Sequence, residues 1–365
     1  MKYQPKMAPI HVAQFRLRNQ RIANTSFTEP KDVVHWMGAV QAQDYLGSLW
    51  AIALRMQNAT QRDIEKAIAD KTIVRTWPMR GTLHFVAATD LRWMLNLLGP
   101  RVIARSAPRY KQFELDEPLL RKSNTVLARA LRGHRQLTRQ ELAAHLKRSG
   151  IATGGQRLLH IIGRAALEGL ICHGARRGKQ FTFALVDEWL PASKTLDRDE
   201  ALAELANRYL ASHGPATLHD FQWWSGLPMR DARAALASVE SQFQQSIVDG
   251  RTHWFATPEP GARRAPPPGY LLPAFDEFLV GYRDRSAALD PDLARRHAPP
   301  NTDGMLSPTI ILDSRVVGTW RRVLKKGFVL IAPILFTALS RHEKKALATA
   351  ATEYGAFLGL PTLLT

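Results

Sequence analysis

The chain has 365 residues, of which 45% are hydrophobic and 22% charged, a composition typical of a globular protein with roughly two to four domains. No stretch approaches the roughly 18 apolar residues of a membrane helix, and the N-terminus lacks the apolar core of a secretory signal. Cys172 is the single cysteine, which excludes an internal disulfide and Cys-rich zinc sites, and the twelve histidines lack HxH or HxxxH spacing. We therefore expect a cytoplasmic protein with no metal and no cofactor.

The chain carries a strong excess of positive charge. Fifty Lys and Arg residues against 32 Asp and Glu residues give a net charge of +18. Residues 101–180 alone contain 17 basic and 5 acidic residues, a net +12. Clustered cations release counterions when they bind a polyanion, whereas dispersed charge mainly keeps a protein soluble. The distribution favours nucleic acid as the partner over an anionic membrane surface.

Residues 8–88 are predicted to form the first module. The segment HVAQFRLRNQRI has the pattern of a helix, and Thr28 is expected to cap a second helix that begins at Glu29-Pro30. The segment VRTWPMRGTLHFVA predicts strands within residues 73–87, around a turn at Trp77-Pro78. Two helices and a strand pair are therefore expected in this module.

Residues 89–190 are predicted to form a second, strongly basic module. LTRQELAAHLKRSG predicts a helix in which Thr138 and Glu141 make a capping box. GGQRLLHIIGRAALEGL predicts a second helix with Arg157 and Arg164 off its apolar face, and ICHGARRGKQFTFALV alternates like two strands around a basic tip. The apolar face of the second helix is predicted to contain Leu158, Leu159, Ile162, Ala166 and Leu170.

Residues 197–258 are predicted to repeat this order as a third module. An amphipathic helix is followed by a helix capped by Thr217, a helix opened by Pro228, and a hairpin that turns at Asp249-Gly250. The three modules thus share one plan of helices followed by a strand pair.

A linker rich in Pro and Gly, residues 259–269, is predicted to separate these modules from a C-terminal domain at residues 270–365. TIILD, RVVGTW and GFVLIAP predict strands, with a turn before the basic run that starts at Arg321-Arg322. HEKKALATAATEYGAFLG predicts a closing helix. We expect a small sheet or partial barrel.

The order helix, turn, helix and hairpin is typical of a winged helix, and the strand pairs argue against a helical solenoid of similar repeat length. The predicted fold class is α+β and mainly helical, with tandem winged helix-turn-helix units and a small C-terminal β-rich domain. Such units meet duplex DNA through a helix and a hairpin, although each cation could instead pair with a carboxylate. The candidate DNA contacts are Arg75, Arg80, His84, Arg157, Arg176, Arg177, Lys179, Arg321 and Arg322.

Two further clusters invite a catalytic and a structural interpretation. Asp276 and Glu277, in FDEFLVGYRDR, could form an acid/base pair, but alternating charges beside aromatic residues favour an ion-pair network that joins the C-terminal domain to the winged helices. Trp223 and Trp224 have helical spacing with Phe221 and are predicted to lie in the core, although one ring could instead face a base or stack on an arginine.

The triplet Gln41-Ala42-Gln43 lies between a helix that is expected to end near Gly38 and the run YLGSLW. In an extended segment, residues i and i+2 point the same way, so both carboxamides would face one space. Each has a carbonyl acceptor and two amide donors, which could hold a water or contact a sugar. A pair of glutamines can equally be a plain hydrogen-bonding feature of the surface.

Four segments together resemble a known family: QAQDYLGSLW, TWPMRGTLHFV at 76–86, YLLPAFDEFLVGYRDR at 270–285 and VVGTWRR at 316–322. The resemblance is to the winged-helix DNA-binding family that contains the AlkZ-type and YcaQ-type DNA glycosylases. In that family a Gln-x-Gln motif is the catalytic signature of the AlkZ type, whereas the YcaQ type has Asp at the second polar position. Gln43 occupies that position here, so the chain resembles the AlkZ type.

The resemblance implies hydrolysis of the N-glycosidic bond of N7-alkylated purines in double-stranded DNA, including bases within interstrand crosslinks, without a lyase step. An N7-alkylated purine is already cationic and can leave without a general acid, so the enzyme must mainly place a water. Gln41 and Gln43 would orient that water, with Asp44 an auxiliary charge. Because glutamines are poor bases, unmodified purines should survive.

The sequence is compatible with two functions from different classes: a monofunctional DNA glycosylase, and a winged-helix DNA-binding regulator or structural protein with no catalysis. A regulator usually dimerises to read a two-fold operator, whereas an enzyme with several modules in one chain can work as a monomer. We expect a monomeric glycosylase that is cytoplasmic and associates with the nucleoid when it is bound to DNA.

Overall fold

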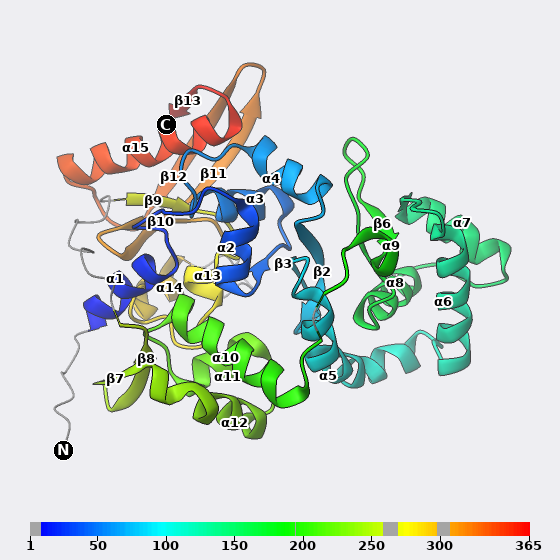
Figure 1. The fold of residues 1–365 in the computed structure, drawn as a ribbon. Coiled ribbons are helices and arrows are strands. Elements are labelled where there is room, and N and C mark those ends of the chain that lie inside the picture. The colour runs from blue at the N-terminus through cyan, green and yellow to red at the C-terminus, as the bar shows by residue number, and fades with distance from the viewer. Residues whose placement is uncertain (1–8, 194, 258–268, 298–306) are drawn as a thin grey trace. The chain divides into compact units, whose positions relative to one another are not determined.

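The computed structural model describes residues 9–193, 195–257, 269–297 and 307–365, and Figure 1 shows the chain as a ribbon. These residues form an α+β fold, about half of it helical. In the described part of the chain, no helix is long and apolar enough to cross a membrane.

The chain divides into two compact units, one of residues 1–64 and 202–365 and the other of residues 65–201. The boundary between residues 64 and 65 falls within α4 (Gln61–Ala69) and within the predicted module 8–88. The predicted linker, residues 259–269, lies outside the described residues except for Gly269, where a strand begins. The module boundaries therefore stay predictions.

The unit of residues 65–201 contains a hairpin, two long helices and a set of shorter elements. These are β2 (Ile73–Met79), β3 (Thr82–Ala87), α5 (Leu91–Gln112), α6 (Glu117–Leu131), β4 (Leu137–Thr138), α7 (Arg139–Arg148), α8 (Arg157–Leu167), β5 (Ile171–His173), β6 (Thr182–Leu185) and α9 (Val186–Trp189). The strands β4, β6 and β5 form an antiparallel sheet in that spatial order. The chain thus runs strand, helix, helix, strand, strand through this part of the unit.

The start of α7 confirms the predicted capping box. Thr138 Oγ1 accepts a hydrogen bond from the Glu141 amide at 3.3 Å, and the Glu141 carboxylate accepts one from the Thr138 amide at 2.6 Å. These bonds satisfy two amides that have no partner within the helix. The capping box therefore fixes where α7 begins.

The apolar face of α8 differs from the predicted one at two positions. Leu159, which was expected on the buried face, is 44% exposed, whereas Arg164 is 8% exposed. The Arg164 guanidinium pairs with Glu117 at 2.9 Å and Glu168 at 2.6 Å, which permits its burial. The residues of α8 that are buried in the hydrophobic cluster are Leu158, Ile161, Ile162, Ala165 and Ala166.

The predicted turn at Trp77-Pro78 is wrong, because both residues lie inside β2. The β2–β3 hairpin turns instead at Arg80 and Gly81, whose φ angles are 57° and 79°. Two consecutive positive φ angles match the right-handed twist of the two strands, and glycine adopts such angles without a steric cost.

The other unit begins with α1 (Pro9–Asn19), α2 (Pro30–Met37), β1 (Val40–Gln41) and α3 (Tyr45–Ala53). The predicted cap of α2 at Thr28 is wrong, since Glu29 is the N-cap residue and its side chain makes no capping bond. Pro30 at the first helical position disfavours a helical conformation for Glu29, which is extended.

The helices and the hairpin predicted within residues 197–258 are confirmed. The elements of this segment are α10 (Arg198–His213), α11 (Leu218–Ser225), α12 (Met229–Val239), η1 (Glu240–Gln242), β7 (Gln244–Val248) and β8 (Arg251–Phe255). Thr217 caps α11 in a capping box with Asp220, and Pro228 precedes α12. The β7–β8 hairpin turns at Asp249 and Gly250, with φ angles of 49° and 72°. Of the predicted core pair, Trp224 is fully buried, but Trp223 is 42% exposed.

The C-terminal part of the chain forms a curled five-stranded sheet in the order β13-β12-β11-β10-β9, and α15 runs alongside it in Figure 1. Its elements are β9 (Gly269–Leu272), α13 (Glu277–Val280), α14 (Pro291–His297), β10 (Thr309–Leu312), β11 (Arg315–Lys325), β12 (Phe328–Leu335), α15 (Arg341–Leu358) and β13 (Thr362–Leu364). The predicted turn before Arg321-Arg322 is wrong. β11 continues through both arginines, and the chain turns at Lys326-Gly327.

Packing of α15 against the sheet also links the sheet to the N-terminal helices. The Tyr354 ring of α15 makes edge contacts with Trp50 at 5.2 Å and with Trp320 at 5.0 Å between ring centroids. The Trp50 indole also donates a hydrogen bond to the Leu271 carbonyl at 2.6 Å. As a result, α3, which follows the Gln-x-Gln motif, is anchored on the C-terminal sheet.

Candidate active site

The Gln41-Ala42-Gln43 motif lies in a tight connection between α2 and α3. Gly38 ends α2 with a φ of 73°, Gln41 is the second residue of β1, and Asp44 is the N-cap residue of α3. Gln41 is 9% exposed and Ala42 is fully buried, whereas Gln43 is exposed. The motif thus contains one buried glutamine, Gln41, and one exposed glutamine, Gln43. That the two carboxamides face one space stays a prediction.

A buried carboxylate lies directly behind the motif. Glu277 Oε1 accepts a hydrogen bond from the Gln41 backbone amide at 2.9 Å. Glu277 Oε2 accepts one from the Trp224 indole at 3.1 Å and lies 3.6 Å from His213 Nε2. Burial lowers the pKa of His213 despite the opposing effect of Glu277. The residues around Glu277 therefore come from β1, α10 and α11.

The neighbouring carboxylate, Asp276, forms a buried ion pair. Arg55 donates two hydrogen bonds to Asp276, at 2.9 and 3.0 Å, and a third to Gln20 Oε1 at 2.8 Å. The Arg55 and Asp276 side chains are at most 1% exposed. The predicted ion pairing of this segment is confirmed at Asp276 and Arg55, whereas its role in joining a C-terminal domain to winged helices stays a prediction.

An ion pair also brings Arg322 to the motif. Its guanidinium lies 3.4 Å from the carboxylate of Asp44, which directly follows Gln43. The adjacent Arg321 is exposed on β11. Of the two arginines predicted from the basic run, the structure thus places Arg322 beside the motif.

In the unit of residues 65–201, the candidate contacts of the β2–β3 hairpin differ in exposure. Arg75 is 5% exposed, with its guanidinium 4.4 Å from the Phe181 ring centroid, and His84 is fully buried. His84 Nδ1 lies 2.9 Å from the Thr82 carbonyl, and Nε2 lies 3.3 Å from Arg80. Arg80 is the most accessible of the three candidates.

The basic tip between β5 and β6 carries three of the predicted contacts. Arg177 is exposed and donates to Glu141 at 2.9 Å, and Arg176 lies 3.7 Å from Glu65. Lys179 is exposed, and among the described residues no carboxylate lies within ion-pair distance of it. Arg157 of α8 instead donates to the Phe113 carbonyl. The hairpin tip therefore offers more accessible charge than the start of α8.

Arg75 and Lys179 line one cavity of about 440 Å³ with several aromatic side chains. The rings of Trp77 and Phe183 lie 5.2 and 4.5 Å from the His173 ring. Burial lowers the pKa of His173 to about 3, and the nearby Arg75 adds to this shift. The His173 ring is therefore neutral near pH 7 and packs as a planar apolar group.

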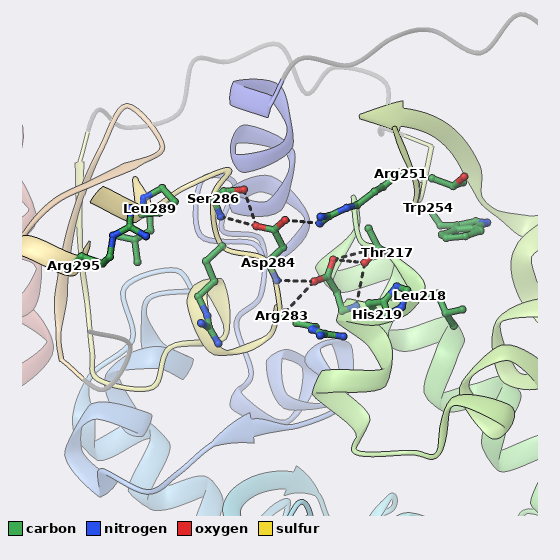
Figure 2. A pocket seen from close by; sticks show the side chains of 14 residues that line it. Thr217, Leu218, His219, Arg251, Trp254, Arg283, Asp284, Ser286, Leu289 and Arg295 are labelled. Atoms are coloured by element: carbon green, nitrogen blue, oxygen red, sulfur yellow. Dashed lines mark hydrogen bonds and ion pairs between the residues drawn. The ribbon is translucent and has the colours of Figure 1, made fainter. Parts of the chain in front are cut away.

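A larger cavity, of about 870 Å³, is lined by arginines of the other unit, as Figure 2 shows. Arg251 pairs with Asp284 at 2.7 Å, and the backbone amide of the exposed Arg283 donates a hydrogen bond to the Asp220 carboxylate at 3.0 Å. Sequence reasoning missed this cavity because its arginines come from β8 and from the segment after α13, which are distant in the chain. Such a basic hollow can hold an anion such as a phosphate group.

Metal ligands do not gather in the described part of the chain, where no three His, Cys, Asp or Glu side chains are placed to hold one ion. The groups that surround the motif are amides, an indole and ion-paired or hydrogen-bonded carboxylates. They can orient polar molecules by hydrogen bonds.

Comparison with known proteins defines the class to which this fold and motif belong. The family model described as DNA glycosylase AlkZ-like matches residues 34–357. The chain therefore belongs to the AlkZ-like DNA glycosylase family, a family of hydrolases that act on N-glycosyl bonds. This membership places it among enzymes rather than among non-catalytic regulators.

Two proteins of Streptomyces sahachiroi show how similar the chain is to known members of the family. The chain is 28% identical over 334 residues to an interstrand DNA cross-link repair glycosylase, a match that spans 86% of this chain and 87% of that protein. It also superposes on the solved structure of the DNA glycosylase AlkZ with a TM-score of 0.77 and 25% identity, over 99% of this chain and 100% of that one. The similarity therefore extends over nearly the whole chain.

Proposed function

We propose that the chain hydrolyses the N-glycosidic bond of N7-alkylated purines in double-stranded DNA, without a lyase step, and that Gln41 and Gln43 are its catalytic residues. The observation that carries this proposal is that a chain of the AlkZ-like DNA glycosylase family contains the Gln41-Ala42-Gln43 motif. Gln41 is fixed from behind by Glu277, and Gln43 is exposed to the surface. The name of the S. sahachiroi relative suggests interstrand crosslinks as further substrates.

The chemistry suits neutral side chains. The alkylated purine carries a positive charge and leaves as a neutral base, so the bond can break without a general acid. The carboxamide oxygens of Gln41 and Gln43 would accept hydrogen bonds from a water and aim it at the sugar carbon as the bond breaks. The same dipoles would favour the cationic character that develops on the sugar. Unmodified purines would be poor substrates because no strong acid protonates them.

We further propose that β4, α7, α8, β5 and β6 form a winged helix-turn-helix unit, and that α11, α12, β7 and β8 form another. The first is supported by its strand order, β4-β6-β5. The second is supported by an isolated antiparallel bridge between Ala216 and Trp254, which lies beside the β7–β8 hairpin as β4 lies beside β6. Both proposed winged-helix units contain a capping box at the start of their first helix, α7 in one and α11 in the other. The tandem arrangement predicts duplex DNA as the partner.

DNA contacts would come from the predicted cations, with the hairpin tip of Arg176, Arg177 and Lys179 as the leading surface and Arg80 in second place. Arg75, His84 and Arg157 are more enclosed by protein contacts and would mainly support their neighbours. Arg321, Arg322 and the arginine-lined cavity would contact the strand that carries the lesion. We propose that the protein acts as a monomer in the compartment that holds the DNA.

The test is base release from a duplex that carries one N7-methylguanine. The double variant Gln41→Ala/Gln43→Ala should lose about 100-fold to 1,000-fold in the single-turnover rate while DNA affinity changes little, since removed water-positioning groups act on the transition state. A second arm uses a duplex crosslinked through guanine N7 atoms and follows its conversion to separate strands.

The matched control is Gln242→Ala, which removes an exposed glutamine of η1 and should retain the full rate. Undiminished release of N7-methylguanine by the double variant would contradict the assignment of the motif. Absence of any base release by the unmodified protein would contradict the proposed substrate.

A further inference from the structure

We propose that Glu277 is the positioning residue of the Gln-x-Gln motif: its buried carboxylate fixes the backbone at Gln41 and thereby the direction of both carboxamides. This inference rests on the proposed function of the motif. Glu277 would touch neither the water nor the DNA. It would act through the hydrogen bond to the Gln41 amide, which links residues 236 positions apart in the chain.

The backbone around Glu277 is built to hold the side chain in place. Phe275 has a φ of 62°, an uncommon angle for a residue with a side chain, and it turns the chain before α13. The Asp276 side chain then accepts from the Phe278 amide at 2.9 Å and caps α13. Glu277 is fully buried at the first position of this short helix.

The other end of the same segment is also fixed. The Tyr282 hydroxyl donates to the His213 carbonyl at 2.7 Å and accepts from Gln20 at 2.9 Å. The Tyr209 hydroxyl donates to the Gly281 carbonyl at 2.9 Å. Since residues on both sides of Glu277 are anchored in the core, the carboxylate is a rigid point to which β1 can attach.

The geometry also explains why this position holds a carboxylate. Two N–H donors approach from different elements, the Gln41 amide from β1 and the Trp224 indole from α11. A carboxylate can accept both, whereas the carboxamide of a glutamine has one acceptor oxygen and would turn its NH₂ group toward one donor. An aspartate has a shorter side chain and would have to move its backbone to reach both.

The two adjacent carboxylates differ in what they hold. Asp276 is matched by the buried guanidinium of Arg55, so this pair joins two parts of the fold. Glu277 instead holds the motif itself, because it accepts the backbone amide of Gln41. Gln41 is the last residue of β1 and lies two residues before Gln43. A displacement of about 1 Å in a catalytic group can cost roughly 100-fold in rate. A loss of the Glu277 contact should therefore slow the reaction more than it weakens DNA binding.

The first test compares two isosteric variants of buried carboxylates that each accept an indole N–H. Glu277→Gln removes an acceptor behind the motif, whereas Asp90→Asn changes one that serves the Trp93 indole at the start of α5. Single-turnover excision of N7-methylguanine is measured with enzyme in excess, together with the DNA Kd and the Tm, at a temperature where all variants are folded. We expect Glu277→Gln to slow excision at least about tenfold with an unchanged Kd, and Asp90→Asn to lower the Tm while keeping the rate.

The second test is a rescue. Trp224→Phe/Glu277→Gln removes the competing indole donor, so the remaining carboxamide oxygen can accept the Gln41 amide while its NH₂ group faces the space left by the indole. We expect this double variant to be faster than Glu277→Gln, although the loss of a buried indole lowers its Tm. A purely structural role predicts the opposite order, because the double variant has lost more packing.

The proposal is overturned if Glu277→Gln excises within about threefold of the unmodified rate, if Asp90→Asn is equally slow, or if the double variant shows no recovery. The Gln41→Ala/Gln43→Ala variant in the same assay separates the two hypotheses. If that variant is slow and Glu277→Gln is fast, only the role of Glu277 fails. If the glutamine variant is also fast, the proposed function of the motif fails.

Discussion

The Gln-x-Gln motif and the hairpin between β5 and β6 are both polar, yet they are built in opposite ways. Behind the motif, Glu277 and Asp276 are almost fully buried, and each is held by hydrogen bonds of 2.9–3.1 Å. At the hairpin tip, Arg177 and Lys179 are exposed to solvent. Burial fixes direction, as chemistry on one bond requires, whereas exposed cations can follow phosphate groups of any sequence.

The difference should appear first in stability. Arg55→Met removes the guanidinium from a fully buried pair and leaves Asp276 without it, which should lower the free energy of unfolding by about 3–5 kcal/mol. Arg251→Ala breaks the exposed pair with Asp284 and should cost at most about 1 kcal/mol. Urea unfolding monitored by tryptophan fluorescence measures both. Equal losses would show that burial does not separate the two kinds of ion pair.

A second prediction concerns pH, because β5, the strand that leads into the hairpin tip, ends with the buried titratable residue His173. Burial lowers the pKa of His173 from its ordinary value of 6.5 to about 3. As pH falls below 6.5, the unfolded chain binds a proton at this residue and the folded chain does not, so the folded state loses stability through the window from 6.5 to 3. The loss from this residue at pH 5 should be about 2 kcal/mol relative to pH 8.

Burial also lowers the pKa values of His213 and His253, so they add to the same decline. The variant His173→Phe keeps a planar ring between Trp77 and Phe183 and should show a shallower decline than the unmodified protein. Urea unfolding at a series of pH values provides the measurement. An identical decline in both proteins would exclude His173 as a source of the pH dependence.

The smallest expected effect lies at the hairpin tip. Arg176→Ala/Arg177→Ala/Lys179→Ala should weaken DNA binding roughly tenfold and reduce the slope of log K against log salt by about two to three, while the excision rate at saturating enzyme stays the same. The matched variant Arg251→Ala/Arg283→Ala removes two arginines from the cavity in Figure 2. A larger loss of affinity in this second variant would move the main DNA contact away from the hairpin.

Local signals in the sequence predicted much of the secondary structure. The capping box at Thr138, the helix cap at Thr217 and the turn at Asp249-Gly250 were all placed correctly. Each depends on bonds or angles within about four residues, so neighbouring side chains suffice to specify it. The errors at Thr28 and at Trp77-Pro78 are also local, since proline fits several extended and helical positions.

The burial of α8 was harder to predict, because it depends on what packs against the helix. Arg164 is buried since Glu117 and Glu168 neutralise it, and Glu117 belongs to a different helix. Leu159 is left exposed. Helical spacing defines a set of possible faces, and only the surrounding helices and ion pairs select the one that is buried.

For the candidate active site, the sequence by itself determined the Gln-x-Gln motif, its resemblance to a glycosylase signature and the excess of positive charge. Only the tertiary structure decided what holds the motif. Glu277 lies 236 residues from Gln41, and Arg322 lies 278 residues from Asp44. Such pairs form because the β9–α13 segment and the C-terminal sheet pack against the N-terminal helices. No periodicity or spacing in the chain records which distant carboxylate will meet a given backbone amide, because that choice is made by the packing of the whole unit.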